Sequence, residues 1–219
     1  MLYDGRQRPQ SVLLKNRLFI VYNGDARPTK NDKGSAYPML ISYDPRDRSF
    51  SKPVRLGQKS DSDHHYSPII WADKDDYLHV LFGCHKTPGT HLISEHPVNN
   101  GTSKITWQEG TQIAPRLSYP TVYRIDGDRE VIYYRTDGHT SSWTYRISED
   151  NGRTWIEPAK DVTDLDSKGR LDWSSYQTKL PSRDAKYLNV VYTDYDDNKH
   201  SPDPQRFFNP RYDRLASNE

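Results

Sequence analysis

Short runs of strand-forming residues, separated by turn residues, recur along the whole chain and constrain its fold more than any other feature. The runs are rich in Val, Ile, Leu and Tyr, and they cover residues 17–22, 68–71, 77–82, 121–125, 130–135, 143–147 and 187–192. No comparable stretch repeats its apolar residues at intervals of three and four, as a helix packed on a core would. The sequence therefore predicts an all-β protein with almost no helix.

The composition excludes several classes of protein. The 219 residues include 31 Lys and Arg against 30 Asp and Glu, a net charge of +1, which argues against nucleic-acid binding through bulk charge. Mean hydropathy is low, but 12% of the residues are aromatic, which favours a folded chain over a disordered one. No run approaches the roughly 20 apolar residues of a membrane helix, and residues 1–10 lack the apolar core of a signal peptide. We expect neither a nucleic-acid nor a membrane partner.

Residues 148–155 carry the clearest local motif. They read Ser-Glu-Asp-Asn-Gly-Arg-Thr-Trp and fit the Asp-box pattern S-x-D-x-G-x-T-W of sialidase-like β-propellers. In such a turn Asp150 accepts backbone N–H groups, Gly152 takes a positive φ, and Trp155 packs between neighbouring blades. The motif is structural, and we assign it no catalytic role.

Weaker copies of the motif lie upstream, in residues 42–50 and 93–107, and the aromatic markers Phe50, Trp107 and Trp155 recur about 50 residues apart. Repeats of this length with four strands each indicate propeller blades. We therefore predict one β-propeller domain over residues 1–219, with four-stranded blades and Asp-box turns. The blades are placed at about 9–57, 64–113, 117–162 and 174–219, the last one incomplete. About four blades suggests a fragment of a larger propeller.

Polar and aromatic residues occupy equivalent places in successive blades. If Pro68 and Pro120 correspond, His65 and Tyr119 lie just before the first strand of a blade, and His85 and Arg135 lie at the end of its second strand. Antiparallel pairing puts these two places side by side. Tyr176 precedes the fourth blade in the same way. The five side chains should therefore meet at one rim of the propeller.

This set of side chains suits proton abstraction beside a carboxylate. It contains no pair of carboxyl groups, which ordinary glycoside hydrolysis needs. Arg135 would pair with a uronate carboxylate and stabilise the charge that develops when the adjacent proton leaves. Either His65 or Tyr119 would remove that proton, and the other would protonate the departing oxygen.

At these residues the sequence resembles the BNR-4 repeat family of β-propellers, which includes the ulvan lyases. The resemblance is densest in residues 63–94, through DHHYSPIIWAD and HVLFGCHKTPGTHLIS. The active centre of those lyases looks like His65, His85, Tyr119, Arg135 and Tyr176 here, with 20 residues from position 65 to 85 and 16 from 119 to 135. In this chain Tyr66 and Lys86 follow the two histidines, where the family pattern has Asn.

The resemblance implies β-elimination at a 4-linked uronic acid of an anionic, sulfated polysaccharide such as ulvan. It implies no redox cofactor, leaves a structural metal ion open, and implies about seven blades and a secreted or periplasmic protein. His64, Lys86 and Arg116 are the expected substrate-binding residues of the rim. We expect a monomer if the ring is complete.

Other interpretations remain open at this point. The same propeller could carry a rhamnosidase-like glycoside hydrolase with a His-centred site, or a non-catalytic glycan-binding or truncated module. Arg135 could simply pair with Asp137, and Tyr119 and Tyr176 could be ordinary packing residues. A zinc site at Cys84, His85, His91 and His96 is disfavoured, because adjacent Cys84 and His85 would face opposite sides of a strand and no second thiol exists.

Overall fold

The computed structural model describes nine stretches of the chain, namely residues 7–24, 35–58, 60–61, 64–98, 104–125, 128–138, 141–157, 173–196 and 209–216. Every regular element within them is a β-strand, apart from one 3₁₀ turn at His64–Tyr66. The predicted all-β class is thus confirmed. In the described stretches no helix is long and apolar enough to cross a membrane.

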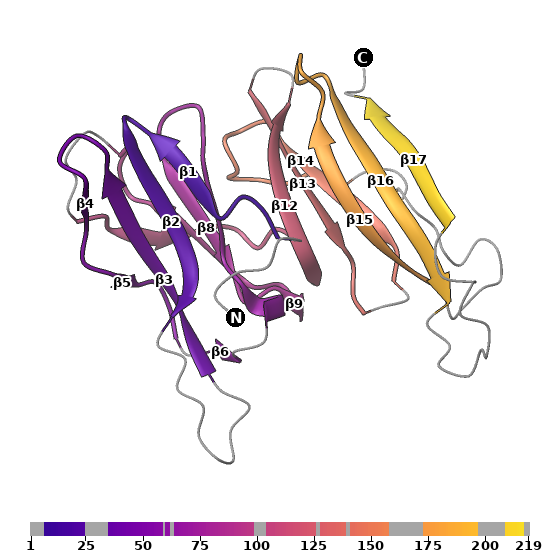
Figure 1. The fold of residues 1–219 in the computed structure, drawn as a ribbon, viewed down its shortest axis with the longest axis horizontal. Coiled ribbons are helices and arrows are strands. Elements are labelled where there is room, and N and C mark those ends of the chain that lie inside the picture. Colours follow the sequence, from indigo (N-terminus) through magenta and orange to yellow (C-terminus); the bar gives the residue numbers. More distant parts are fainter. Residues whose placement is uncertain are drawn as a thin grey trace.

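The strands form four antiparallel sheets that follow the chain in order, except that β9 (His85–Thr87) joins the third sheet (Figure 1). The first contains β1 (Ser11–Leu14), β2 (Arg17–Gly24), β3 (Ser35–Asp44), β4 (Ser49–Phe50), β5 (Val54–Arg55) and β6 (Ser60–Asp61). The second contains β7 (Ile69–Ala72), β8 (Leu78–Phe82), β10 (Thr90–Ser94) and β11 (Trp107–Glu109). The third contains β9 (His85–Thr87), β12 (Leu117–Ile125), β13 (Arg129–Arg135) and β14 (Trp143–Ser148). The fourth contains β15 (Trp173–Pro181), β16 (Tyr187–Asp196) and β17 (Asn209–Ala216). The predicted blade limits stay predictions.

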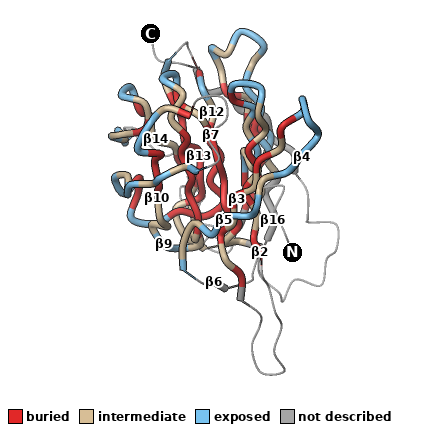
Figure 2. The backbone as a smooth tube through the Cα atoms, turned by 90° about the vertical axis from the view of Figure 1, so that its left-hand side faces the viewer, coloured by how far each residue is buried: buried red, intermediate tan, exposed pale blue. Residues whose placement is uncertain are grey.

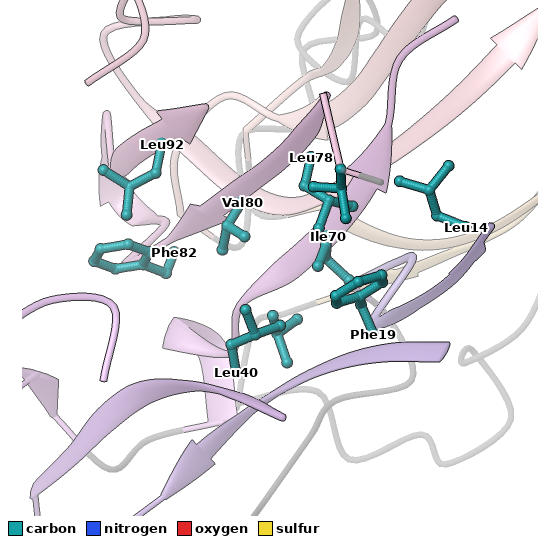
Figure 3. Close-up of a cluster of buried hydrophobic side chains, with 10 residues drawn as sticks. Leu14, Phe19, Leu40, Ile70, Leu78, Val80, Phe82 and Leu92 are labelled. Carbon is teal, nitrogen blue, oxygen red and sulfur yellow. The ribbon is translucent and has the colours of Figure 1, made fainter. Parts of the chain in front are cut away.

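A hydrophobic core lies between each pair of successive sheets. The first core joins side chains such as Phe19 and Leu40 of the first sheet to Ile70 and Val80 of the second (Figure 3). The second lies between the second and third sheets, and the third core, built mainly of aromatic rings, lies between the third and fourth. Figure 2 shows the buried residues concentrated along the inner strands, with the exposed ones in the loops. This face-to-face succession of sheets is the architecture of propeller blades.

Some strands of the second sheet have apolar residues at consecutive positions because both faces of this sheet are covered. Successive side chains of a strand point to opposite faces of the sheet. In β7, Ile70 therefore enters the first core, while Ile69 and Trp71 enter the second. A strand that is covered on both faces needs apolar residues at consecutive positions.

The Asp-box turn has the structure that its sequence predicts. Asp150 Oδ1 accepts the backbone N–H groups of Arg153 at 3.1 Å and Thr154 at 2.8 Å. Gly152 has a φ of 71°, and a Cβ at this position would lie 2.8 Å from Glu130 Oε2. Trp155 packs against the core between the second and third sheets. The turn therefore serves packing between these two sheets.

Residues near the amino terminus tie the second and third sheets together. Ile70 N of β7 donates to Pro9 O at 2.8 Å, and Val122 N of β12 donates to Arg8 O at 2.9 Å. Gln7, which is fully buried, donates from Nε2 to the carbonyl oxygen of His65 at 2.8 Å. This segment thus fixes the backbone of the 3₁₀ turn that precedes β7.

Candidate functional site

The structure brings all five predicted rim residues together, and we call His65, His85, Tyr119, Arg135 and Tyr176 the rim cluster. The ring centroids of His65 and His85 lie 4.3 Å apart, and those of His65 and Tyr119 lie 5.2 Å apart. Tyr176 meets the edge of Tyr119 at 6.0 Å, and Arg135 Cζ lies 4.7 Å from the centroid of the Tyr119 ring. Two imidazoles, two phenols and one guanidinium therefore form one continuous group.

Some of these residues reach the cluster differently from the prediction. His65 precedes β7 and Arg135 ends β13 as expected, but His85 does not end the second strand of its blade. The chain leaves β8 after Phe82, turns at Gly83 with a φ of 75°, and places His85 in β9, where it pairs with Ser118 of the third sheet. A positive φ is readily adopted only by glycine, which makes this exit possible.

Tyr119 and Tyr176 lie within strands rather than just before them. Tyr119 occupies an irregularity of β12, between Ser118 and Thr121, where the register with β13 shifts. Its φ is 55°, a conformation that bulky residues avoid unless the surrounding structure holds them in it. Such bulges redirect side chains, often beside functional sites. Tyr176 lies in β15, one residue after the buried Ser175.

Arg135 is the most unusual member of the cluster. It is fully buried, and its Nε lies 3.4 Å from the carbonyl oxygen of Asp137. Its Nη1 and Nη2 atoms have no hydrogen-bond partner among the residues that the structure describes. The Asp137 carboxylate pairs instead with Arg116, so the simple Arg135–Asp137 ion pair is wrong. A buried guanidinium with two unsatisfied nitrogen atoms is suited to bind an anion with a planar pair of oxygens.

The structure places two of the three expected substrate-binding residues near the loop that follows β13. Lys86 and Arg116 are exposed, and both lie near the loop that follows β13, because Lys86 Nζ lies 3.5 Å from the position of a Cβ on Gly138 while Arg116 pairs with Asp137. His64 lies in the 3₁₀ turn, but its side chain is outside the described part of the structure.

The sequence analysis did not identify several residues that contact the rim cluster or the backbone next to it. Gln7 holds the carbonyl of His65, and Ser118 Oγ accepts the N–H of Lys86 at 3.1 Å. Trp143 stacks with Tyr119, with centroids 6.3 Å apart and planes at 15°. Of these residues, only Trp143 could have been found from the sequence. It is an aromatic residue at the start of the strand-forming run that follows the run ending in Arg135.

A second histidine pair lies between the second and third sheets, and with its neighbours it forms what we call the interior polar cluster. Its members are buried, and they are Trp71, Asp73, His79, His91 and Glu130. His91 Nδ1 lies 3.2 Å from Thr111 O, His91 Nε2 lies 3.1 Å from His79 Nδ1, and His79 Nε2 lies 3.4 Å from Asp73 Oδ2. Because a carbonyl only accepts, the neutral His91 ring donates from Nδ1 and accepts from His79.

Burial shifts the pKa values of this interior cluster. It lowers the pKa of His91 to about 3, with a further contribution from His79. It also raises the pKa of Glu130 to about 7, although the hydrogen bond from Trp71 Nε1 at 3.0 Å opposes the shift. His91 is therefore neutral at ordinary pH, and Glu130 titrates near neutrality.

The residues considered for zinc do not form a site. Cys84 is buried, with its sulfur 3.9 Å from the carbonyl oxygens of Phe82 and Pro88, and burial raises the pKa of its thiol. His91 is engaged with His79. Among the described residues, no group of three or more His, Cys, Asp or Glu is arranged to hold a metal ion.

Curated proteins with related sequences include ulvan lyases. An ulvan lyase of Alteromonas sp. (strain LOR) is 28% identical over 185 residues, which cover 76% of this chain and 36% of that protein. An ulvan lyase of Nonlabens ulvanivorans is 25% identical over 211 residues, 87% of this chain and 41% of that protein. This chain thus spans little more than a third of the curated relatives that it matches.

Solved structures support the same fold. A PL25 ulvan lyase superposes with a TM-score of 0.68 at 22% identity, over 89% of this chain and 47% of that one. The polysaccharide lyase Uly1 also gives a TM-score of 0.68, at 14% identity, over 96% of this chain and 52% of that one. These likenesses confirm the β-propeller fold.

A family model agrees with the pattern of sheets and with the resemblance carried by residues 63–94. The model describes BNR repeat-containing family members (BNR_4) and matches residues 33–206, most of the chain. The chain therefore belongs to the BNR repeat-containing family.

Proposed function

We propose that this chain carries the active centre of a polysaccharide lyase that cleaves a uronate-containing, sulfated glycan of the ulvan type by β-elimination. The observation that carries the proposal is the buried Arg135 guanidinium, whose two outer nitrogen atoms have no partner in the described structure and which lies against Tyr119. The names of the relatives support it, and one solved PL25 ulvan lyase is bound to -[GlcA(1-4)Rha3S]-.

In this reaction Arg135 pairs with the uronate carboxylate and stabilises the negative charge that develops on it. The adjacent C–H bond breaks and its proton passes to one of His65 and Tyr119. The electron pair forms a carbon–carbon double bond, the glycosidic C–O bond breaks, and the other residue protonates the departing oxygen. The rings of His65 and Tyr119 lie 5.2 Å apart, which is close enough for both to contact one sugar unit once the glycan is bound. His85, 4.3 Å from His65, orients that imidazole.

Access to Arg135 requires a side chain to move. Arg135 is fully buried, and its Cζ lies within 6.0 Å of the ring centroids of Tyr119, Trp143 and Tyr176. Tyr119 and Trp143 are each 1% exposed, whereas Tyr176 is half-buried. We therefore assign the movement to Tyr176, which makes room for the carboxylate when the glycan binds.

The outer part of the substrate meets the exposed cations. Lys86 and Arg116 flank the loop after β13, and we propose that they, with His64, contact the sulfate and carboxylate groups of neighbouring sugars. Such exposed charges mainly attract and orient a polyanion. Because a polymer of this kind does not cross membranes, the protein should act outside the cytoplasm.

Ultraviolet absorbance tests the proposal directly, because only elimination creates a conjugated unsaturated uronyl product. The full chain is incubated with a panel of uronate polysaccharides that includes ulvan, and we expect a rise in absorbance with at least one of them. In Tyr119→Phe the rate should fall by about 10³-fold, the range for loss of a general acid or base.

The matched control is Tyr145→Phe, since Tyr145 packs in the same aromatic core without belonging to the rim cluster. This variant should retain its rate within about twofold. Release of saturated sugars would indicate a hydrolase on the same propeller. Full activity of Tyr119→Phe would remove Tyr119 from the mechanism.

A further inference from the structure

Trp143 is a buried aromatic residue that stands directly beside the rim cluster. It begins β14 and lies opposite Arg135 of β13 in the antiparallel register. Residues that are directly opposite share one face of a sheet. Its side chain is 1% exposed and belongs to the aromatic core between the third and fourth sheets.

This one side chain contacts two members of the rim cluster and the residue that precedes a third. Its ring stacks with Tyr119, and its centroid lies 6.0 Å from Arg135 Cζ. Its indole N–H donates to the carbonyl oxygen of Ser175 at 3.2 Å, one residue before Tyr176 in β15. Trp143 therefore joins two side chains of the third sheet to the backbone of the fourth.

Trp143 is itself held in place from another direction. The Tyr133 ring stacks with it, with centroids 5.7 Å apart and planes at 21°, and Lys179 Nζ lies 4.7 Å from its centroid. Tyr133 in turn donates its hydroxyl to Gln177 Oε1 of β15. The indole is thus fixed by contacts that do not belong to the rim cluster.

Tyr119 needs such support more than an ordinary core residue does. Its φ of 55° is a strained backbone conformation for an aromatic residue, and strained residues persist only where packing holds them. A flat ring that stacks on Tyr119 limits both its backbone and its side-chain angles. Loss of that ring would let the phenol shift relative to Arg135.

We propose that Trp143 is a positioning residue, which fixes the Tyr119 ring and the Arg135 guanidinium relative to the strand that carries Tyr176. The catalytic consequence of this role rests on the proposed lyase function, whereas the geometric role does not. A displacement of about 1 Å in such a group can lower turnover by about 10²-fold.

The test compares Trp143→Phe with a matched variant, Trp155→Phe. Trp155 is partly buried and, like Trp143, donates its indole N–H to a backbone carbonyl, that of Gly152 at 3.2 Å, but it lies in the Asp-box turn. We expect Trp143→Phe to lower kcat by about 30-fold, with KM changed less than about threefold. Trp155→Phe should keep kcat within about twofold. Circular dichroism establishes that both variants are folded.

A second measurement does not depend on the reaction. Tyr119 is 1% exposed in the native protein, so tetranitromethane should nitrate it slowly, and peptide mass spectrometry can follow this one residue. Trp143→Phe should raise its nitration rate at least about fivefold over that of Trp155→Phe, because the stacked ring no longer holds it.

Together, kcat and the nitration rate of Tyr119 distinguish a failure of the proposed lyase function from a failure of the positioning role of Trp143. If the native chain eliminates no uronate glycan but Tyr119 becomes reactive only in Trp143→Phe, the positioning role stands and the lyase function falls. Equal kcat and equal nitration of Tyr119 in the two variants would overturn the role of Trp143.

Discussion

The rim cluster and the interior polar cluster are built from similar residues, but they differ in how their polar atoms are satisfied. Each contains two histidines in contact with an aromatic ring, and each lies where neighbouring sheets meet. In the interior cluster the histidine nitrogen atoms meet Thr111 O, Asp73 and each other, and the one buried side-chain atom without a partner in the described structure is Glu130 Oε1. In the rim cluster, His65, His85 and Tyr176 are partly exposed, and the outer nitrogen atoms of Arg135 have no partner in the described structure.

This difference teaches that residue types alone do not mark a reactive site. Polar groups that satisfy one another in a buried place stabilise a fold, because leaving one of them unpaired would cost free energy. Polar groups that stay unsatisfied beside an opening can bind a ligand instead, at the expense of stability. Substitutions in the rim cluster should therefore mainly lower activity, whereas substitutions that remove a partner in the interior polar cluster should mainly lower stability.

The largest contrast should come from Arg135→Met. Turnover should fall by about 10³-fold, as when a charge-stabilising donor is removed from an active site. The free energy of unfolding should rise by about 1 kcal/mol, because an apolar side chain of similar length replaces a buried charge with unsatisfied nitrogen atoms. Absorbance assays and urea denaturation measure the two effects, and a strongly destabilised variant would contradict this account.

His79→Ala should show the reverse signature. It leaves Asp73 and His91 buried without their shared partner and should lower the free energy of unfolding by about 3 kcal/mol. The activity of the folded protein should change less than about twofold, because His79 lies outside the rim cluster. Urea denaturation and assays at low temperature test this, and a variant of native stability would show that the interior cluster is dispensable.

Glu130→Gln should make stability less dependent on pH. Burial raises the pKa of Glu130 from 4.5 to about 7, so the unfolded chain ionises first as the pH rises. The contribution of Glu130 to stability is thus complete below pH 4.5 and is lost as the pH rises through about 7. We compare the free energy of unfolding of the variant with that of the native protein at each pH. Between pH 4.5 and pH 8 this difference should shift by about 2 kcal/mol in favour of the amide variant. Unfolding curves at the two pH values would refute this if the difference stayed constant.

Exposed cations near the rim should give the smallest effect. Arg116→Ala removes an exposed ion pair with Asp137, so the free energy of unfolding should change by less than about 1 kcal/mol. If Arg116 attracts a polyanionic substrate, KM should rise about threefold at low salt, and the difference should shrink as salt is added. If the native protein and the variant have the same KM at every salt concentration, Arg116 does not contact the substrate.

The sequence predicted much of the local structure because the relevant signals are local. Alternating strands and turn residues lie next to each other in the chain, so the Asp-box turn around Asp150 and the strand that ends at Arg135 could be expected. The meeting of Tyr119 with Arg135 followed from hairpin pairing between the neighbouring strands β12 and β13, whereas His85 meets His65 from β9, outside the hairpin that the prediction used.

Other features depend on contacts between sheets that are distant in the sequence. Trp143 reaches Ser175, Trp71 reaches Glu130, and Gln7 reaches His65, and no periodic pattern reveals such pairs. The exit of His85 into β9 likewise depends on the neighbouring sheet that receives it. Packing decides these contacts, because each needs two surfaces to meet in a particular orientation.

The amino-acid sequence by itself determined the all-β class and the Asp-box turn, since strand patterning and turn chemistry act within a few residues, and equivalent positions in successive blades predicted which five residues meet. Only the tertiary structure decided that Arg135 is buried with its outer nitrogen atoms unsatisfied and that Asp137 pairs with Arg116 instead. The reason is physical, because whether a polar atom finds a partner depends on every surface packed around it.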